Sequence, residues 1–563
     1  MLDRIKKFLE KKNIYAEIVG SKIISTHKIE GADIKISGEL PDEFPHILPR
    51  LYLLNRKSYG SLAHVGWNDN NEGLICKGVS INRHIDYSNP EIVYFQTLMN
   101  AIETLTNLLK DENKNRNEII SEFSAHWRFQ IDNSSQKVIS FIEHDNKIKP
   151  LIVYKTFDPK NRELFCLLDN SNNINSEYSY LRRLESKKQN IGKAIYIPVE
   201  SQILPPGPNT NLKKWWLSLL NSFTANKNKS LKEIARHNKS KILWVILSVK
   251  IGKNNYSWIC IKFTNDKKEP PPLYTSCDIR NWRLFPYSVE VHNEAYIKPR
   301  GGGFCDMKNK SIALVGCGSV GAEVAKMISA IGIGKLILVD FDILKIENIQ
   351  RHLLGGEYID YPKVSALKIE LSRKYPYVNI IESDKKKLKD CLDESFLSNI
   401  DGIIIATGDP TEERFFNEEL LKKSNRPWSI YIWVEGHGVG GHAIYVHSKG
   451  LGCLNCLYRN QYGEKSLNSI QNFLESKQEI AVDIAGCGTH FLPYSYIDAV
   501  QTAVLGTRLA TYALQDKLNE SCRVSWKGSN TSNLLTTYRY KNFDNSLNIE
   551  PLYWEGCDVC NKK

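Results

Sequence analysis

The chain has 563 residues, which is too long for a single hydrophobic core and predicts about three domains. Its 75 basic and 63 acidic residues leave a net charge of +12, and the surplus is scattered through Lys/Asn-rich stretches such as 111–118 and 385–389. No basic helix face with interleaved aromatic residues stands out, so the charge favours a solvated lysine-rich surface over a specific nucleic-acid interface.

The spacing of the cysteines and the lengths of the apolar segments predict the cellular compartment of the protein. The thirteen cysteines include two Cys-x-x-Cys pairs and lack the regular spacing of a disulfide framework, which favours a reducing environment. Residues 1–12 are charged and amphipathic and lack the apolar centre of a signal peptide. The most apolar run, Ile242–Val249, is too short to span a bilayer. We therefore expect a soluble, cytoplasmic protein without a membrane partner.

The first predicted domain, residues 1–112, reads as a small α+β unit. It begins with the charged helix and contains an irregular loop that carries Cys76. Asn89 followed by Pro90 predicts the cap and first turn of a long helix. The other predicted elements are a strand at Asp33–Ser37, a turn at Leu40–Pro45, a strand at Leu51–Leu54 and the end of the long helix near Leu109.

The middle region, residues 113–300, predicts a mixed α/β linker domain. Its loops are rich in Asn, Ser and Pro, and no catalytic constellation is evident in it. Its candidate strands are Leu151–Lys155, Ala194–Val199, Leu243–Val249 and Ser257–Phe263.

Residues 301–563 change to a strand, glycine loop, helix, strand pattern that predicts a doubly wound α/β domain. The predicted elements are strands at Ser311–Val315, Lys335–Asp340 and Gly402–Ala406, with a helix at Ala322–Ile331.

The glycine loop contains Gly316, Gly318 and Gly321, whose small size lets backbone amides approach a phosphate at a helix N-terminus. Asp340 lies 19 residues beyond Gly321, at the end of the next strand, where a carboxylate can bind ribose hydroxyls. Taken alone, this pattern fits NAD(P) binding as well as ATP binding.

The residues that follow favour a triphosphate. Asn348 and Arg351 come just after the ribose-binding strand, Lys363 follows a proline at a helix start, and Asp409 ends a later strand. Two cations and a carboxylate competent for Mg²⁺ suit the stabilisation of a leaving pyrophosphate, which hydride transfer does not require. Surface ion pairing is the alternative for Arg351 and Lys363 individually, but the ordered set favours ATP.

Two cysteine pairs predict a structural zinc site. Cys453-x-x-Cys456 and Cys557-x-x-Cys560 supply four thiolates, which fill a tetrahedral site and leave no open position for water. The alternative is a pair of redox dithiols, but neither pair lies in a thioredoxin-like context.

Between these pairs lies Cys487, in the stretch Ala-Gly-Cys-Gly-Thr-His. It follows a polar stretch that we expect to be a mobile crossover loop, and its flanking glycines would expose a nucleophilic thiolate. Thr489 or His490 is placed to polarise the thiol. A small buried core cysteine is the alternative, and for Cys317, inside the glycine loop, packing is the favoured interpretation.

The ordered motifs from Val339-Asp-Phe-Asp342 through Asn348-Ile-Gln-Arg351 and Tyr361-Pro-Lys363 to Asp409 resemble the adenylation domain of ubiquitin-activating enzymes. The bacterial ThiF and MoeB activators of sulfur-carrier proteins share the pattern. The resemblance implies that Asp340 holds ribose, Arg351 and Lys363 contact phosphates, Asp409 binds Mg²⁺ and Cys487 forms a thioester. The family's arginine-bearing segment before the first strand is missing, and Arg300 is the candidate replacement.

The first domain resembles the ubiquitin-conjugating fold, on Phe44-Pro45, Pro49–Leu54, His64 and Gly73-Leu-Ile-Cys76. The resemblance implies that Cys76 accepts an acyl group by transthiolation. The usual His-Pro-Asn triplet is absent, and His64 or Asn68 is the candidate for stabilising the oxyanion. For His64 a structural role, and for Cys76 a packed core thiol, are the alternatives.

The combination resembles the fused activating/conjugating enzymes of bacterial CBASS anti-phage operons. It implies a homodimer that uses ATP, Mg²⁺ and structural Zn²⁺ to join the C-terminal tail of a cGAS-like nucleotidyltransferase to a lysine-bearing acceptor. The rivals are a sulfur-carrier adenylyltransferase of thiamine or molybdopterin type, a non-catalytic scaffold and an NAD-dependent oxidoreductase. The first would not need Cys76.

Overall fold

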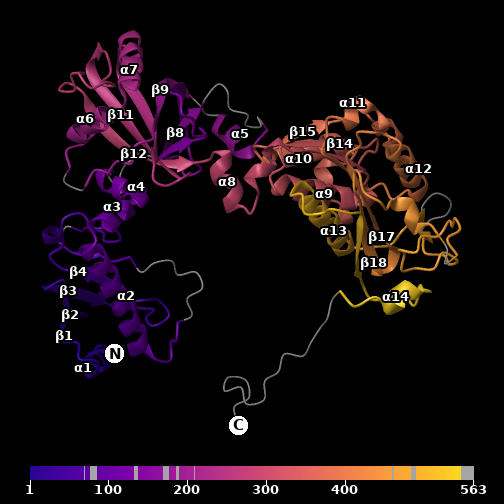
Figure 1. Ribbon diagram of the computed structural model, residues 1–563, viewed down its shortest axis with the longest axis horizontal. Helices are drawn as coiled ribbons and strands as arrows, with labels where there is room; N and C mark the ends of the chain where they lie inside the picture. Colours follow the sequence, from indigo (N-terminus) through magenta and orange to yellow (C-terminus); the bar gives the residue numbers. More distant parts are fainter. Residues whose placement is uncertain are drawn as a thin grey trace. The chain divides into compact units, whose positions relative to one another are not determined.

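The computed structural model describes residues 1–68, 70–76, 85–131, 137–168, 177–185, 189–207, 210–459, 462–483 and 490–546. The chain divides into two compact units (Figure 1). One unit comprises residues 1–172 and 187–293, and the other comprises residues 173–186 and 294–563. Among the helices in the described part of the chain, none combines the length and apolar character needed to cross a bilayer.

The first unit opens with an antiparallel five-stranded sheet of order β1-β2-β3-β4-β5. One side packs against α1 and α2, since Ile5, Leu9, Ile36, Tyr94 and Leu98 share one buried cluster. The elements are α1 (Leu2–Lys11), β1 (Ala16–Val19), β2 (Lys22–Ile29), β3 (Ala32–Glu39), β4 (Arg50–Leu53), β5 (Gly73–Leu74) and α2 (Pro90–Lys110).

The predicted helices and strands of residues 1–112 are therefore present, but the predicted cap of α2 is wrong in detail. Asn89 occupies the N-cap position without a side-chain capping bond. Its Nδ2 instead donates to Asp86 Oδ2 at 2.7 Å, so the asparagine stabilises the preceding turn.

Two short helices, α3 (Glu112–Ser121) and α4 (Phe123–Trp127), follow α2. Asp111 caps α3 by accepting a bond from the Lys114 amide at 2.9 Å. Phe123 and Trp127 are buried in the core of the following barrel, which anchors α4 there.

The rest of the first unit is a closed barrel of order β10-β11-β12-β6-β8-β7-β9. Alternate residues of β10 face two different cores: Trp244 and Ile246 lie in one cluster, and Val245 and Leu247 lie in the other with α6 and α7. The elements are β6 (Lys137–Ser140), β7 (Lys149–Phe157), β8 (Glu163–Leu168), β9 (Gln189–Val199), α6 (Leu212–Asn221), α7 (Ala225–His237), β10 (Ser240–Lys250), β11 (Tyr256–Glu269) and β12 (Arg283–Val291).

All four strands predicted in this region are present, and three further strands, β6, β8 and β12, were missed. β6 has only four residues, and β12 contains Pro286, a residue that normally argues against a strand. Barrel closure itself depends on pairing between distant strands, such as β12 with β6, which no local pattern indicates.

The second unit is built on a seven-stranded sheet of order β15-β14-β13-β16-β17-β18-β21. The first five strands in that order are parallel, and β18 and β21 are antiparallel to their neighbours. The strands are β13 (Ser311–Val315), β14 (Lys335–Val339), β15 (Asn379–Glu382), β16 (Gly402–Ile405), β17 (Trp428–Val434), β18 (Gly440–Val446) and β21 (Cys522–Lys527), with a separate pair formed by β19 (Val482–Asp483) and β20 (His490–Phe491).

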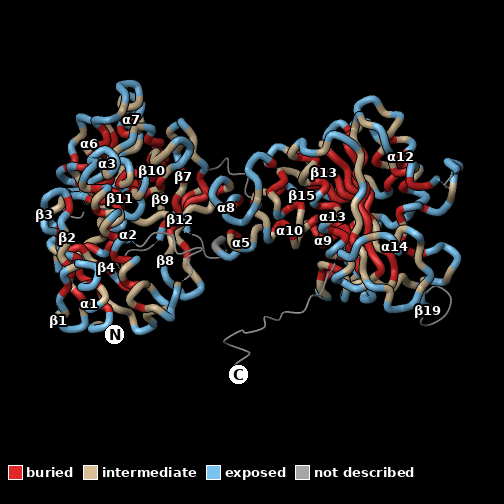
Figure 2. Tube along the Cα trace, turned by 60° about the horizontal axis from the view of Figure 1, so that its bottom comes forward, coloured by how far each residue is buried: buried red, intermediate tan, exposed pale blue. Residues whose placement is uncertain are grey.

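Helices cover both faces of this sheet, because its strands contribute to two buried clusters that each include helical residues. Figure 2 shows the strands of the sheet as buried. Leu314 and Ile404 face the core under α9, α10 and α13, whereas Val315 and Ile405 face the core under α12. This confirms the predicted α/β architecture. The helices are α5 (Ser179–Glu185), α8 (Glu294–Arg300), α9 (Ser319–Ala330), α10 (Lys363–Lys374), α11 (Glu394–Leu397), α12 (Pro410–Leu421), α13 (Tyr496–Leu514) and α14 (Tyr538–Asn542).

Candidate functional site

The glycine loop joins β13 to α9 and requires glycine at two positions. Gly316 has a φ of +89°, and a Cβ there would lie 2.5 Å from the Ala406 carbonyl oxygen. A Cβ at Gly321 would lie 1.9 Å from the Gly316 carbonyl oxygen. Gly318, the N-cap of α9, has open space on its Cβ side. The loop therefore packs tightly against backbone atoms at Gly316 and Gly321 and leaves space beside Gly318, at the N-terminus of α9. An open helix N-terminus of this kind suits phosphate binding.

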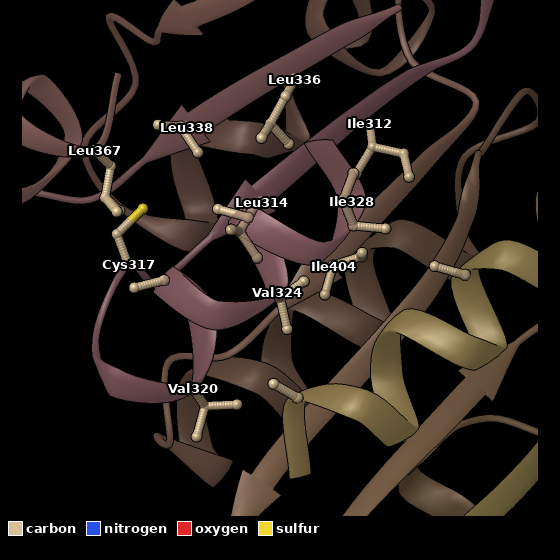
Figure 3. Close-up of a cluster of buried hydrophobic side chains, with 14 of the residues drawn as sticks. Ile312, Leu314, Cys317, Val320, Val324, Ile328, Leu336, Leu338, Leu367 and Ile404 are labelled. Carbon is tan, nitrogen blue, oxygen red and sulfur yellow. The ribbon is translucent and has the colours of Figure 1, made fainter. Parts of the chain in front are cut away.

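The side chain of Cys317 points into the core beneath this loop, beside Leu338 and Leu367 in the cluster shown in Figure 3. It is fully buried, and burial raises the pKa of its thiol well above the usual range. The prediction that Cys317 is a packing residue is confirmed.

Asp340 lies immediately after β14, next to the glycine loop. Its Oδ2 accepts a hydrogen bond from the Cys317 amide at 2.6 Å, and its Oδ1 accepts one from the Asp342 amide at 2.8 Å. β13 lies between β14 and β16 in the sheet, so the strand order reverses beside this loop. Ligands of doubly wound folds bind at such a reversal.

Arg351 ends a short 3-10 helix, Ile346–Arg351, that begins with a bond from the Lys345 amide to Asn348 Oδ1 at 3.2 Å. The Arg351 guanidinium lies 4.3 Å over the ring of Tyr494, and its Nη1 donates to the Leu492 carbonyl at 2.9 Å. These contacts hold the cation beside α9, because Tyr494 Oη is 2.7 Å from Ser319 Oγ.

Lys363 is the first residue of α10, as predicted from the preceding proline. It is buried, and its Nζ lies 2.9 Å from Asp342 Oδ2. The Asp342 amide in turn contacts Asp340, so the lysine belongs to the same hydrogen-bonded group.

Asp409 caps α12 by accepting bonds from the amides of Thr411 and Glu412 at 2.9 and 3.0 Å. One turn further, Glu413 is 3% exposed, and its Oε1 accepts bonds from Thr407 Oγ1 at 2.7 Å and the Gly408 amide at 3.1 Å. Burial raises the pKa of Glu413 to about 7. Glu413 was not among the residues predicted from the sequence; its sequence signal is a second acidic side chain one turn after the Asp-Pro helix start.

A cavity of about 640 Å³ opens over these elements. Its walls include the start of α9, Arg351, Glu413 and apolar side chains of β17. Of the predicted residues, Gly318 and Arg351 line it, and Asp409 lies between the lining residues Gly408 and Pro410. The glycines and polar or charged side chains of the lining that bear on its chemistry are Gly318, Arg351, Thr407, Gly408, Glu413 and Glu435.

Glu435 lies at the end of β17 and fixes one wall of this cavity. It is buried, and its two carboxylate oxygens accept bonds from the amides of Phe473 and Leu474 at 2.5 and 2.8 Å. His442, fully buried, lies 2.7 Å from Glu435 Oε1. The described part of the expected mobile crossover is thus anchored at Phe473, which is also fully buried.

Cys453 and Cys456 are 3.8 Å apart at sulfur, at the start of a 3-10 turn. Cys487, Thr489, Cys557 and Cys560 lie outside the described residues. Within the described ranges, no group of three His, Cys, Asp or Glu side chains is placed to hold a metal ion.

Cys76 is exposed and lies two residues after the end of β5; its exposure excludes the packed core alternative. Its amide donates to the His64 carbonyl at 2.7 Å. Asn68 is occupied by Glu72, donating to its Oε2 at 3.1 Å and accepting from its amide at 2.8 Å. Arg300 stacks on Tyr296 at 4.1 Å and is not among the residues that line the described cavity.

Comparison with known proteins finds one family match toward each end of the chain. Residues 300–549 match the ThiF family, and residues 5–135 match the prokaryotic E2 family B. An ATP-dependent ubiquitin transferase-like protein Cap2 of Pseudomonas aeruginosa is 28% identical over 236 residues, 40% of each chain. A protein of the same name from Escherichia coli is 24% identical over 507 residues, 79% of each chain.

The chain thus spans less than half the length of the first relative and most of the second. Among solved structures, Escherichia coli MccB with ATP is 17% identical, with a TM-score of 0.29, over 41% of this chain and 64% of that one. The family matches confirm the predicted pairing of a ThiF-type domain with an E2-type domain. Residues 5–135 are thus similar to the prokaryotic E2 family B and residues 300–549 to the ThiF family, and the chain is similar in sequence to ATP-dependent ubiquitin transferase-like proteins.

Proposed function

We propose that this enzyme activates the C-terminal carboxylate of a protein with ATP, captures it as a thioester and joins it to an amine. The observation that carries the proposal is the cavity beside the glycine loop, where a helix N-terminus and Arg351 meet. Amide donors and a fixed guanidinium stabilise the charge that develops on phosphate as pyrophosphate leaves. The ThiF match and the names of the Cap2 relatives support ATP as the activating substrate.

In the proposed adenylation, the open amides at Gly318 bind phosphate, and Asp340 binds the ribose. The substrate carboxylate attacks the α-phosphorus of ATP, giving an acyl-adenylate and pyrophosphate. Arg351 and Lys363 balance phosphate charge. Lys363 is held by Asp342, and Arg351 by Tyr494, so neither needs to reorganise during the reaction.

Two metal ions are part of the proposal. Asp409, at the edge of the cavity, would hold Mg²⁺, which supplies charge neutralisation for the polyphosphate when bound. Cys453 and Cys456 fit half of a structural zinc site, because two sulfurs on a tetrahedral zinc with Zn–S bonds of about 2.3 Å lie about 3.8 Å apart. Their observed separation is 3.8 Å. Cys557 and Cys560 are the proposed other half.

The proposed relay then uses two cysteines. The Cys487 thiolate attacks the adenylate carbonyl and releases AMP, and the Cys76 thiolate displaces Cys487 from the resulting thioester. An acceptor amine finally attacks the thioester on Cys76 and forms an amide. The exposure of Cys76 and the E2-family match of residues 5–135 support this last role. A sulfur-carrier adenylyltransferase would leave that domain without a purpose.

The proposed donor is the C-terminal tail of a cGAS-like nucleotidyltransferase of a CBASS operon, and the acceptor carries a lysine. We propose three functional parts, with boundaries at 1–112, 113–300 and 301–563, that act in a cytoplasmic homodimer, as related adenylation domains do. The middle part links the two catalytic ones.

Intact-protein mass spectrometry tests the relay. The enzyme is incubated with Mg-ATP and the nucleotidyltransferase of the same operon, as wild type and as Cys487→Ala and Cys76→Ala. A thiol-labile adduct that persists in Cys76→Ala and vanishes in Cys487→Ala is the expected result. An adduct that survives in Cys487→Ala would reverse the order, and AMP release without any adduct would favour a sulfur-carrier activator.

A further inference from the structure

The segment opposite Cys76 carries an ionisable cluster that the relay leaves without a role. Val65 and Ile75 form an antiparallel bridge, flanked by bonds from Gly66 to Leu74 and from Cys76 to the His64 carbonyl at 2.9 and 2.7 Å. This register places His64 directly opposite Cys76. The bond from the Cys76 amide to the His64 carbonyl makes His64 the backbone neighbour, across this bridge, of the residue that bears the exposed thiol.

Glu122 holds His64 at two points. Its Oε1 lies 2.6 Å from His64 Nδ1, and its Oε2 accepts a bond from the His64 amide at 2.8 Å. The His64 backbone has a φ of +58°, a left-handed conformation that persists only when the surroundings enforce it. Glu122 therefore fixes both the backbone and the ring of His64 beside Cys76.

The other ring nitrogen contacts a second carboxylate. His64 Nε2 lies 3.2 Å from Glu118 Oε2, and each of the two side chains is 32% exposed. Both side chains are therefore partly open to solvent. With Nδ1–H donating to Glu122, a neutral imidazole presents a lone pair at Nε2, beside a carboxylate that attracts an ammonium.

We propose that His64 is the general base for the acceptor amine: Nε2 takes the proton of an incoming lysine ammonium that docks against Glu118, while Glu122 orients the ring. Resting on the proposed function, this assigns the conjugating half of the enzyme its base. In covalent catalysis, a general base is commonly a histidine that a neighbouring carboxylate orients, as Glu122 orients His64 here.

The proton balance of the step is as follows. The ammonium gives one proton to Nε2, and the neutral amine attacks the thioester carbonyl on Cys76. The carbon–sulfur bond breaks, and the second proton lost by nitrogen passes to the Cys76 sulfur. The products are an amide, a free thiol and an imidazolium, which returns its proton to water.

The carboxylates of Glu118 and Glu122 contact His64, and two further charged or titratable groups, His126 and Arg56, lie beyond them. Hydrogen bonding to Glu122 and the charge of Glu118 raise its pKa against an opposing effect of burial. His126 lies 4.0 Å from Glu122, and burial lowers its pKa, which favours its neutral form. The buried Arg56 acts on His126. The two carboxylates next to the ring therefore dominate, and they strengthen it as a base for an ammonium.

The test separates deprotonation from positioning. Cys76 of the full chain is loaded with the nucleotidyltransferase and Mg-ATP, ATP is removed, and the thioester is discharged with free lysine or with hydroxylamine. Hydroxylamine is neutral at pH 7 and needs no base. We expect His64→Gln to slow discharge to lysine about 100-fold or more and discharge to hydroxylamine less than about threefold. His46→Gln, in another loop, is the control.

Glu122→Gln removes the carboxylate that raises the His64 pKa, so the midpoint of the pH–rate curve for lysine should shift to lower pH. A purely structural role does not predict this shift. Equal loss with both nucleophiles in His64→Gln, or an unshifted curve in Glu122→Gln, would overturn the inference. A wild-type enzyme that never carries a thioester on Cys76 would instead overturn the relay.

Discussion

Arg351 and Tyr494 form a stacked pair, with the guanidinium carbon 4.3 Å from the ring centre. The pair joins the segment after β14 to the segment that leads into α13, and the Tyr494 hydroxyl extends the connection to Ser319 at the start of α9. The cation that the proposal assigns to phosphate is therefore fixed to the helix N-terminus to which the proposal assigns the same group.

Replacing Arg351 tests its proposed role. Arg351→Ala should lower the rate of ATP–pyrophosphate exchange about 100- to 1000-fold, the usual cost of removing a fixed donor from a developing charge. Arg351→Lys keeps the charge but loses the planar stack and should recover only part of the rate. Arg373→Ala, on α10, is the matched control. Exchange in Arg351→Ala within about threefold of wild type would exclude Arg351 from catalysis.

Two glycines of the loop, Gly318 and Gly321, should respond differently to an added methyl group. Gly321→Ala should destabilise the protein by about 1–3 kcal/mol, because the new methyl group meets the Gly316 carbonyl at 1.9 Å. Gly318→Ala should unfold at nearly the wild-type temperature, since nothing lies within 4 Å of its Cβ position. Thermal unfolding monitored by circular dichroism measures both. Equal melting temperatures for the two variants would contradict the tight packing of the loop.

Glu413 should make stability depend on pH in a defined direction. Its pKa is about 7 in the folded protein against 4.5 normally, so the folded state keeps a proton that the unfolded state loses. Its contribution is therefore fully present below pH 4.5 and is lost as pH rises to 7, by about 3 kcal/mol. Glu413→Gln retains the acceptor for Thr407 and removes this loss.

The measurement is the melting temperature of the full chain between pH 5 and 8. Glu413→Gln should melt above wild type by a margin that grows with pH, to about 6–12 °C for a unit of this size. Glu412→Gln changes the exposed neighbouring carboxylate and should show no such trend. A constant difference across the pH range would show that Glu413 has an ordinary pKa.

The proposed zinc site predicts one zinc ion per chain by plasma mass spectrometry. Cys453→Ser and Cys456→Ser should each lose most of it, because removing one of four thiolates opens the site to water. Cys305→Ser alters an exposed cysteine outside both pairs and should retain the metal. Full zinc content in the Cys456→Ser variant would exclude this cysteine as a ligand.

Local sequence patterns predicted three of the seven strands in the main sheet of the second unit, since buried strands such as Ser311–Val315 are short apolar runs next to a glycine turn. They could not predict the barrel, where Pro286 lies within a strand and closure joins segments far apart in the chain. At the site, the side-chain chemistry and the sequence positions of Asp340 and Arg351 were enough to select them as candidate site residues. Their partners were not predictable, because the stacking of Arg351 on Tyr494 and the burial of Glu413 arise only from tertiary packing.

Adenylation of a carboxylate by the ThiF-like part of the chain would leave a defined set of nucleotide products. Chromatography separates these products after incubation of the enzyme with Mg-ATP and the proposed nucleotidyltransferase substrate. We expect AMP and pyrophosphate, formed only when the nucleotidyltransferase carries its intact C-terminal tail. Formation of ADP and phosphate, or turnover independent of that tail, would contradict it.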